Sequence, residues 1–409
     1  MGAGLAGLVA AEALSRRGRD VLMLEASPKA GGRCRSFADD RLGRRIDNGN
    51  HLILSANRGV LDWADRIGGR DALSVMPEAA FPFLDLASGA RWSLRLPPGP
   101  LGMLSGVARP PGVTLGRAAS QAFGLLRAGR ARTVAKAVTD RGPMWRGFWD
   151  PMTRAILNAP PEEADAGLLR AVLLRSFARG AGACRPVLAP EGLGPALIDP
   201  AVEVLAGRGV PIRYRAPVRE VEIADRRVTT LHLREGPLEI GPRDAVILAL
   251  PPQEVAPMLP DLPLPGPGPS IANAHFLLPD SGLPPILALL GGAAQWLFRR
   301  GDVVSVTVSA AEHSPLQGLG RDASLRLLWS EVAAAVRAHG GGVPDALPPA
   351  RFLRERAATF DQSPTGVARR PATRTRWRNL ILAGDHVDTG LPATLEGAVQ
   401  SGLAAARVV

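Results

Sequence analysis

Apolar positions near the N-terminus follow first a helical pattern and then a strand pattern. Residues 5–17 are rich in alanine and place their larger apolar side chains on or near one face, which predicts a helix. Gly18 follows as a stop signal, and residues 21–24 form a short continuous apolar run that ends at Glu25. Such a run is typical of a buried parallel strand, so these elements indicate an α/β fold.

Four later segments extend this alternation of helices and strands. Residues 202–209 predict a helix that ends at a glycine, and residues 218–223 alternate apolar and charged side chains as a half-buried strand does. Residues 245–250 and 380–383 are apolar runs that predict two more buried strands. The second of these runs is followed by a final alanine-rich helix, so strands and helices recur to the end of the sequence.

A glycine motif overlaps the start of the first predicted helix. It consists of Gly2-Ala3-Gly4-Leu5-Ala6-Gly7, and Glu25 lies 23 residues beyond its first glycine. In a dinucleotide-binding unit the first glycine permits a tight turn, the second lets the backbone approach a pyrophosphate, and the third lets helix and strand pack closely. The helix N-terminus then faces the phosphates, and an acid at the strand end binds a ribose hydroxyl. The sequence therefore predicts a dinucleotide site formed by Gly2, Gly4, Leu5, Ala6, Gly7 and Glu25.

Two further motifs indicate which dinucleotide binds. Glu25 is followed after five residues by Gly31-Gly32-Arg33, which resembles the E-(x)5-G-G-R signature of the amine-oxidase and carotenoid-desaturase superfamily of flavoproteins. The segment from Gly384-Asp385 into the final helix resembles the C-terminal FAD motif of the same superfamily. A guanidinium after two permissive glycines can reach a pyrophosphate with charge-assisted hydrogen bonds. The resemblance implies an FAD cofactor bound by Gly32, Arg33, Gly384, Asp385, Leu395 and Glu396, with the backbone of Val218 at the adenine.

The order of these pieces predicts two domains. Residues 1–75, 190–262 and 350–409 form the expected FAD-binding domain, of Rossmann type with a parallel sheet. Residues 76–189 and 263–349 form an inserted α+β substrate domain, and proline-rich joints lie near two of the crossings. The strand that should precede the first glycine is not in the sequence. We therefore expect a truncated first strand and a native chain that begins several residues upstream.

Composition and charge exclude several classes of protein. Of the 409 residues 46% are apolar and 21% charged, as in globular proteins, and no apolar run reaches the length of a membrane span. The net charge is +11, but 47 of the 49 basic residues are arginine and they are scattered, which indicates compositional bias rather than a nucleic-acid partner. Two cysteines without metal-ligand spacing predict no metal site. We expect a cytoplasmic protein, with an anionic membrane surface as the alternative explanation of the charge.

The inserted segments contain few candidates for acid–base chemistry. Residues 144–152 hold two tryptophans, a phenylalanine and two methionines, which either line an apolar tunnel or belong to the core. Residues 115–138 predict a basic helix that either is solvated or rests on a membrane surface. Asp47 and His51 belong to a loop that, in the superfamily named above, crosses the flavin. The resemblance makes His51 the first candidate catalytic residue and Asp47 a weaker one.

The internal sequence is similar to one family within this superfamily. Residues 47–54, 148–151, 356–361 and 391–399 resemble the squalene-associated FAD-dependent desaturases, which are hydroxysqualene dehydroxylases of hopanoid synthesis. The resemblance implies reductive removal of an allylic hydroxyl from an apolar C30 isoprenoid, with an unidentified donor reducing the flavin and His51 as the acid. An oxidative isoprenoid desaturase of the carotenoid type shares every cofactor motif and is the main alternative. An amine oxidase and a non-catalytic lipid-binding flavoprotein relative are weaker alternatives.

Overall fold

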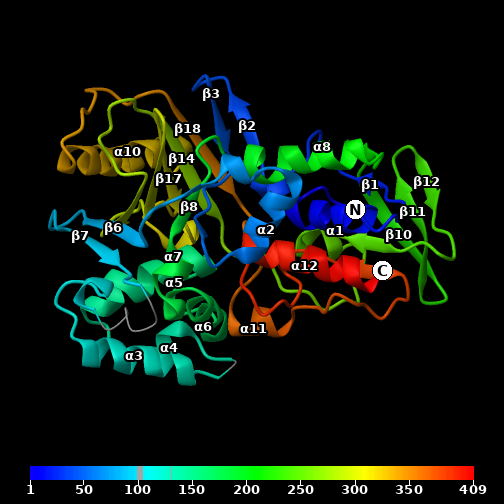
Figure 1. The fold of residues 1–409 in the computed structure, drawn as a ribbon, viewed down its shortest axis with the longest axis horizontal. Coiled ribbons are helices and arrows are strands. Elements are labelled where there is room, and N and C mark those ends of the chain that lie inside the picture. Colours follow the sequence, from blue (N-terminus) through cyan, green and yellow to red (C-terminus); the bar gives the residue numbers. More distant parts are fainter. Residues whose placement is uncertain (99–104, 130) are drawn as a thin grey trace.

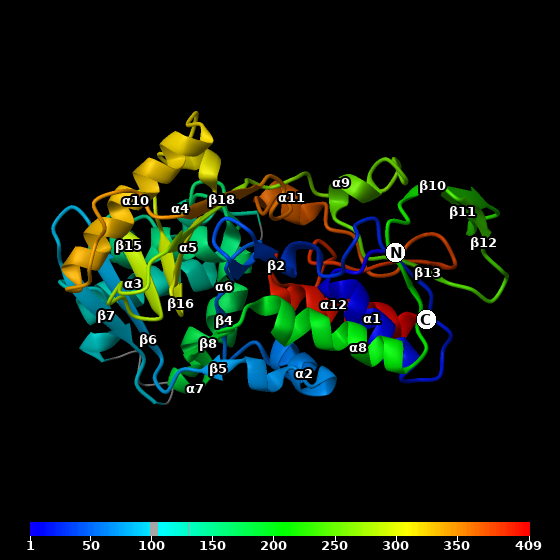
Figure 2. The same ribbon diagram turned by 90° about the horizontal axis from the view of Figure 1, so that it is seen from above.

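The chain forms two units that lie side by side along the long axis of the molecule (Figure 1). The computed structural model describes residues 1–98, 105–129 and 131–409. One unit carries both chain ends and is built around short parallel strands. The other holds a seven-stranded sheet with a long helix, α10, on its outer side, which is clearest in Figure 2. The predicted class, an α/β fold with an inserted α+β unit, is confirmed.

Two parallel strand pairs form the centre of the first unit. The pairs are β1 (Met23–Leu24) with β9 (Ile212–Arg213), and β13 (Val246–Leu248) with β19 (Leu380–Leu382). Residues 1 and 2 lie between the pairs: the Gly2 amide donates to the Leu24 carbonyl at 2.8 Å, and the Ala249 amide donates to the Met1 carbonyl at 2.9 Å. The two pairs are thereby joined into one layer. Its helices are α1 (Leu5–Ser15), α2 (Arg58–Ile67), α8 (Asp199–Gly207), α9 (Pro252–Val255), α11 (Pro364–Ala368) and α12 (Leu395–Val408).

Antiparallel strands extend this unit on its outer sides. They form a three-stranded sheet, a hairpin and a second small sheet: β10 (Val218–Ala224) with β11 (Arg227–Leu233) and β12 (Gly236–Glu239), β2 (Ser36–Asp39) with β3 (Arg44–Asp47), and β4 (Ile53–Leu54) with β8 (Pro186–Leu188) and β5 (Ser74–Val75). The predicted helices and strands of the unit are present, several with shorter bounds. The apolar run 21–24 forms a strand only at its last two residues, because β9 offers only two partners.

Helix α1 is held firmly against its neighbours. A Cβ on Gly402 of α12 would lie 2.4 Å from the Ala6 carbonyl oxygen, so these two helices cross at a distance that only glycine allows. Glu12 is fully buried and pairs with Arg66 of α2 and with Arg208, which directly follows α8. These contacts fix α1 relative to the helices around it, and the N-terminal end of α1 carries the glycine motif.

The seven-stranded sheet divides the second unit into two layers. Its order is β18 (Ala350–Glu355), β14 (Ile271–Leu277), β17 (Val303–Val308), β16 (Trp296–Arg300), β15 (Ile286–Leu290), β6 (Ala80–Asp85) and β7 (Arg91–Arg95), antiparallel except for β15 with β6. One face packs on α10 (Arg321–Ala338) through residues such as Leu297 and Val306. The other face, with Trp296 and Phe298, packs on the shorter helices. These are α3 (Leu115–Arg127), α4 (Val134–Ala137), α5 (Asp150–Leu157), α6 (Ala166–Arg175) and α7 (Ala181–Cys184).

The aromatic segment before α5 belongs to the core. Residues Trp145–Trp149 form a π-helical turn whose three aromatic side chains are all buried. The Trp149 indole N–H donates to Gln121 Oε1 at 2.6 Å, which satisfies its polar group inside the core. Of the two roles considered for residues 144–152, the structure supports core packing.

The predicted basic helix is divided in two. Helix α3 ends at Arg127 and α4 begins at Val134, while Arg130 lies outside the described residues. Within the part of the chain that the structure describes, no helix combines the length and apolar character needed to cross a bilayer.

Strand pairing bears on the predicted domain boundaries. β18 pairs along its whole length with β14, so residues 350–355 lie in the sheet of the second unit rather than in the FAD-binding segment to which the sequence assigned them. β8, near the other boundary, pairs with β4 and β5 of the first unit. The division into domains remains a prediction, and these pairings favour a third FAD-binding segment that begins after Glu355.

Candidate active site

One elongated cavity of about 520 Å³ lies where the parallel strands end, and most of the predicted cofactor residues line it. Those in the lining are Gly2, Gly4, Leu5, Ala6, Glu25, Gly32, Arg33, Val218, Gly384, Asp385 and Leu395, together with His51. Val218 lines the cavity together with Ala216 and Pro217, and the segment directly before α12 contributes Ala393 and Thr394. Three predicted residues, Gly7, Glu396 and Asp47, are not in the lining.

The three glycines of the N-terminal motif have three different surroundings. Gly2 has a φ of +88°, and a Cβ there would lie 2.5 Å from the Ala249 carbonyl oxygen. A Cβ on Gly7 would lie 2.0 Å from the Gly2 carbonyl oxygen, so this glycine is required by the packing of the turn against the helix. A Cβ on Gly4 would meet no atom within 4 Å. The fold therefore requires glycine at positions 2 and 7, whereas the space beside Gly4 is left open toward the cavity.

Glu25 is fixed at the end of β1 by hydrogen bonds to the motif. One carboxylate oxygen accepts the Ala3 amide at 2.6 Å, and the other accepts the Ser27 amide at 2.8 Å. The Ser27 hydroxyl donates to the second oxygen as well, at 2.7 Å. These bonds orient the carboxylate at the cavity wall, where its remaining acceptor capacity is available to a hydroxyl group.

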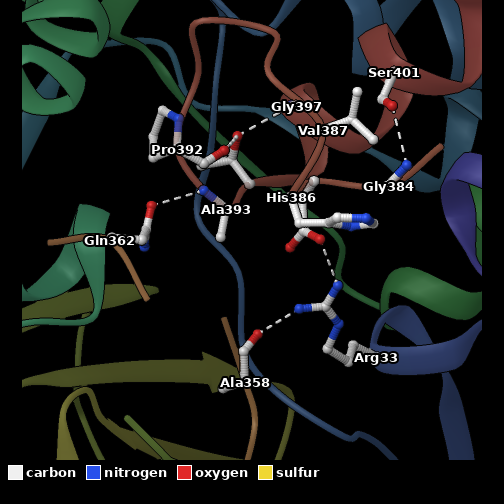
Figure 3. A network of polar contacts seen from close by, with 12 residues as sticks. Arg33, Ala358, Gln362, Gly384, His386, Val387, Pro392, Ala393, Gly397 and Ser401 are labelled. Atoms are coloured by element: carbon white, nitrogen blue, oxygen red, sulfur yellow. Dashed lines mark hydrogen bonds and ion pairs between the residues drawn. The ribbon is translucent and has the colours of Figure 1, made fainter. Parts of the chain in front are cut away.

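An ion pair joins the two halves of the cavity wall (Figure 3). Arg33 donates one guanidinium N–H to Asp385 at 2.8 Å and another to the Ala358 carbonyl at 2.6 Å. Burial works against the charged form of Asp385, but the ion pair and hydrogen bond with Arg33 outweigh it and lower the pKa of this carboxyl. Gly384 precedes it with a φ of +134°, and its amide donates to the Ser401 hydroxyl of α12 at 3.0 Å. The wall thus presents a fixed cation and a fixed carboxylate side by side.

Arg370 holds the loop that carries Asp385, and sequence reasoning did not find it. Its guanidinium donates to the carbonyl oxygens of Asp385, His386, Val387 and Leu391 at distances of 2.6 to 3.2 Å. The side chain is buried and lies over the Phe360 ring. Nothing in the sequence motifs distinguished this arginine from the other arginines of the chain, because its partners are backbone atoms.

We expect Arg370→Met to destabilise the fold and to weaken cofactor binding. Removing the guanidinium leaves four carbonyl groups without a donor, which should lower the free energy of unfolding by about 2–4 kcal/mol. Urea unfolding followed by tryptophan fluorescence measures this loss. Arg369→Met is the matched control, since Arg369 is exposed. Equal stability of the two variants would show that the loop does not depend on Arg370.

Glu396, predicted to bind the cofactor, contacts another helix instead. Its carboxylate oxygens accept the amides of Gly59 and Val60, both at 3.0 Å, at the start of α2. A carboxylate at a helix N-terminus satisfies free N–H groups and complements the helix dipole. Glu396 therefore couples α12 to α2, while its neighbour Leu395 lines the cavity.

His51 faces the cavity without a protein hydrogen-bond partner among the described residues. Burial lowers the pKa of His51 to about 4, with Arg33 and Arg300 adding to the effect and Asp47 opposing it. The imidazole is therefore neutral at pH 7, with one nitrogen that donates and one that accepts. Of the two predicted catalytic residues, only His51 has its side chain in the cavity lining, where a ligand can contact it.

Asp47 is committed to contacts inside the protein. Its carboxylate accepts hydrogen bonds from the Ser36 hydroxyl and from the Leu193 amide, the latter at 3.0 Å. It also forms a buried ion pair with Arg300 of β16. Asp47 thus joins β3 to the sheet of the second unit, and it lies outside the cavity lining.

Glu355 is a further charged residue of the cavity that sequence reasoning missed. It ends β18, lines the cavity, and accepts a hydrogen bond from Asn48 Nδ2 at 3.1 Å. Its position directly before residues 356–361, one of the stretches used for the family resemblance, was the available signal. Glu355 adds a further carboxylate to the cavity lining, in which Arg33 and Arg35 are cationic side chains.

Comparison with known proteins decides the class of this site. The family of flavin-containing amine oxidoreductases matches residues 5–409, which is nearly the whole chain. The chain belongs to this family. Its fold is also that of a cyclohexylamine oxidase from Brevibacterium oxydans (TM-score 0.72, 15% identity, 99% of this chain and 96% of that one) and of a putrescine oxidase (TM-score 0.67, 16% identity, 99% and 97%).

Three curated relatives within the flavin-containing amine oxidoreductases carry the same name. Hydroxysqualene dehydroxylase of Rhodopseudomonas palustris is 40% identical over 413 residues, covering 100% of this chain and 97% of the relative. The proteins of that name from Sinorhizobium fredii and Zymomonas mobilis are 39% and 36% identical over 409 residues, covering 99% of this chain and 96% and 97% of their own lengths. The similarity therefore includes both units of the fold.

The cavity of this flavin-containing oxidoreductase fits FAD, its cofactor. Gly4 leaves open the space that a Cβ would fill, and no side chain caps the start of α1. The first N–H groups of the helix are thus free for a diphosphate, whose charge they and Arg33 can offset. Glu25 offers acceptor capacity where a ribose hydroxyl is expected, and Asp385 offers it further along the wall.

Proposed function

We propose that this protein catalyses the FAD-dependent reductive dehydroxylation of hydroxysqualene to squalene, in hopanoid and squalene biosynthesis. The observation that carries the proposal is the similarity of 36–40% over the full length to three hydroxysqualene dehydroxylases. When bound and reduced, FAD would supply a hydride, which is two electrons and one proton, to the carbon that loses its hydroxyl. With one further proton the oxygen leaves as water, so the reaction is balanced.

Residues of this chain hold the cofactor in a fixed position. In the proposal Glu25 binds a ribose hydroxyl, the Arg33 guanidinium offsets the diphosphate charge, and Asp385 binds a ribityl hydroxyl. The hydrogen bond that Arg33 donates to Asp385 keeps both groups in place before the cofactor arrives, so little side-chain entropy is lost on binding. Val218 contributes its backbone at the adenine end.

His51 assists departure of the hydroxyl. Hydroxide is a poor leaving group, so a proton has to reach the oxygen as the carbon–oxygen bond breaks. With a pKa of about 4, only about one His51 ring in a thousand is protonated at pH 7. We therefore assign His51 a relay in its neutral form, in which one ring nitrogen donates to the leaving oxygen while the other accepts a proton from water.

The proposed partners follow from the chemistry of the reaction. Substrate and product are apolar C30 isoprenoids, so we place the protein in the cytoplasm with peripheral association at the inner membrane surface. An electron donor, not identified by the sequence or the fold, returns the flavin to its reduced form.

Anaerobic single turnover tests the proposed reaction. The flavin-loaded protein is reduced without oxygen and mixed with hydroxysqualene, and recovery of oxidised-flavin absorbance is followed while squalene is quantified. We expect recovery with stoichiometric squalene, and no recovery when squalene replaces hydroxysqualene. A flavin that stays reduced with hydroxysqualene would overturn the proposal, and an oxidised protein that introduces double bonds would favour the oxidative desaturase.

A further inference from the structure

Helix α3 directs a row of apolar side chains toward solvent. Leu115, Ala119, Phe123 and Leu126 recur at intervals of four, four and three residues, which places them on one face of the helix. All four are exposed, with exposed fractions of 41% for Leu115, 57% for Phe123 and 46% for Leu126. The opposite face, through Leu125, packs into the core. We call these four residues the α3 stripe.

The chain segment that carries the α3 stripe is basic. The sequence from residue 86 to residue 139 contains no aspartate or glutamate but eight basic residues, although the whole chain has 49 basic and 38 acidic ones. The Arg127 guanidinium lies over the Phe123 ring at 5.3 Å, and Arg132 and Lys136 follow as exposed cations. The next acidic residue, Asp140, is already paired with Arg117. This segment therefore joins exposed apolar groups to an excess of positive charge.

We propose that the α3 stripe docks the protein on a bilayer that contains anionic phospholipids. An exposed helix with apolar residues on one face and flanking cations is the arrangement that inserts into a headgroup layer, where the cations meet lipid phosphates. A stable protein partner needs about 800 Å² of contact on each side, which three large side chains on one helix do not supply. The proposal rests on the function proposed above in one respect: docking on a bilayer would explain how an apolar substrate reaches the site.

The position of α3 suits this role. Figure 1 shows α3 and α4 along the outer edge of the second unit, on the side away from α10. Leu125 of α3 shares one apolar core with Phe360, and Ala393 packs on that core while it lines the cofactor cavity. A protein resting on α3 would thus have a bilayer on one side of this apolar core and the flavin on the other.

Vesicle flotation tests the docking surface with the flavin-loaded protein. We expect binding to vesicles of phosphatidylcholine with phosphatidylglycerol, and weaker binding to phosphatidylcholine alone or at high salt. The double variant Phe123→Ser/Leu126→Ser should bind the anionic vesicles at least about tenfold more weakly, because two large apolar side chains no longer insert. Leu347→Ser is the matched control, since Leu347 is 43% exposed but precedes β18.

A second readout separates docking from catalysis. Turnover of hydroxysqualene dissolved in detergent micelles should be the same for the double variant and the unaltered protein, because no stripe residue lines the cavity. Vesicle binding that survives the double substitution would overturn the docking surface, as would a dimer in solution that the substitution dissociates. Loss of turnover by the unaltered protein in micelles would instead contradict the proposed function and leave the vesicle result valid.

Discussion

Replacing Gly4 with alanine should remove FAD from the protein and leave its fold intact. A Cβ at this position meets no protein atom within 4 Å, and the backbone conformation, with φ of −75° and ψ of 176°, suits any residue. The added methyl group occupies the space into which a diphosphate must come to reach the first N–H groups of α1. Losing one or two such charge-assisted hydrogen bonds corresponds to about a 100-fold weaker affinity or more. Titration of the apoprotein with FAD, followed by flavin fluorescence, measures this change.

Two matched glycine variants define what the Gly4 result means. Gly207→Ala also introduces a Cβ that meets no described atom within 4 Å, but outside the cavity, so FAD affinity should stay unchanged and the melting temperature should not fall. Gly7→Ala places a Cβ 2.0 Å from a backbone oxygen and should prevent folding. If Gly4→Ala bound FAD normally, the diphosphate would have to lie elsewhere in the cavity.

His51→Ala should retain bound flavin and lose most of its turnover. General acid–base assistance of the kind assigned to His51 contributes about 100- to 10,000-fold. Because no cofactor-holding contact passes through the ring, flavin content should equal that of the unaltered protein. Anaerobic single turnover with hydroxysqualene measures the rate directly, and His51→Gln serves as a variant that donates a hydrogen bond but cannot relay a proton. Full flavin with near-normal turnover in His51→Ala would exclude His51 from the reaction.

The pH dependence distinguishes the relay from a simple acid. Since the pKa of His51 is lowered to about 4, the ring stays neutral as pH rises above that value. A relay through the neutral ring therefore predicts a single-turnover rate that is constant between about pH 5 and 8. If the imidazolium were the working form, the rate would fall about tenfold for each pH unit over the same range, and the relay would be wrong.

The sequence predicted the parts of the site whose chemistry is local. Glycines that recur at fixed spacing before a helix are typical of a dinucleotide site. The function of the N-terminal motif could therefore be predicted from the sequence directly around it. Arg33 and Asp385 were also found, although 352 residues separate them, because each lies in its own short motif. The direct ion pair between them could be seen only in the structure, because neither motif indicates that it contacts the other one.

Other residues whose side chains make tertiary contacts lie outside the cavity lining or were missed. The first turn of α12 indicated that Glu396 faces the cofactor, but its carboxylate turns to α2, as a helical side chain one position from Leu395 must point in another direction. Asp47 belongs to the segment that the sequence indicated. Its carboxylate, however, forms an ion pair with Arg300, which lies in a strand more than two hundred residues away. The hydrogen bonds of Arg370 go to backbone carbonyls, which leave no trace in a side-chain pattern.

The pairing of Arg33 with Asp385 has a consequence for the order of events during synthesis. At about 5–20 residues per second, the 352 residues between them take roughly 20 to 70 s to translate. Throughout that time α1 is made but lacks α12, and the face of α1 that α12 covers in the folded protein stays uncovered. The complete cavity wall, with both its cation and its carboxylate, can therefore form only after the last segment of the chain has been made.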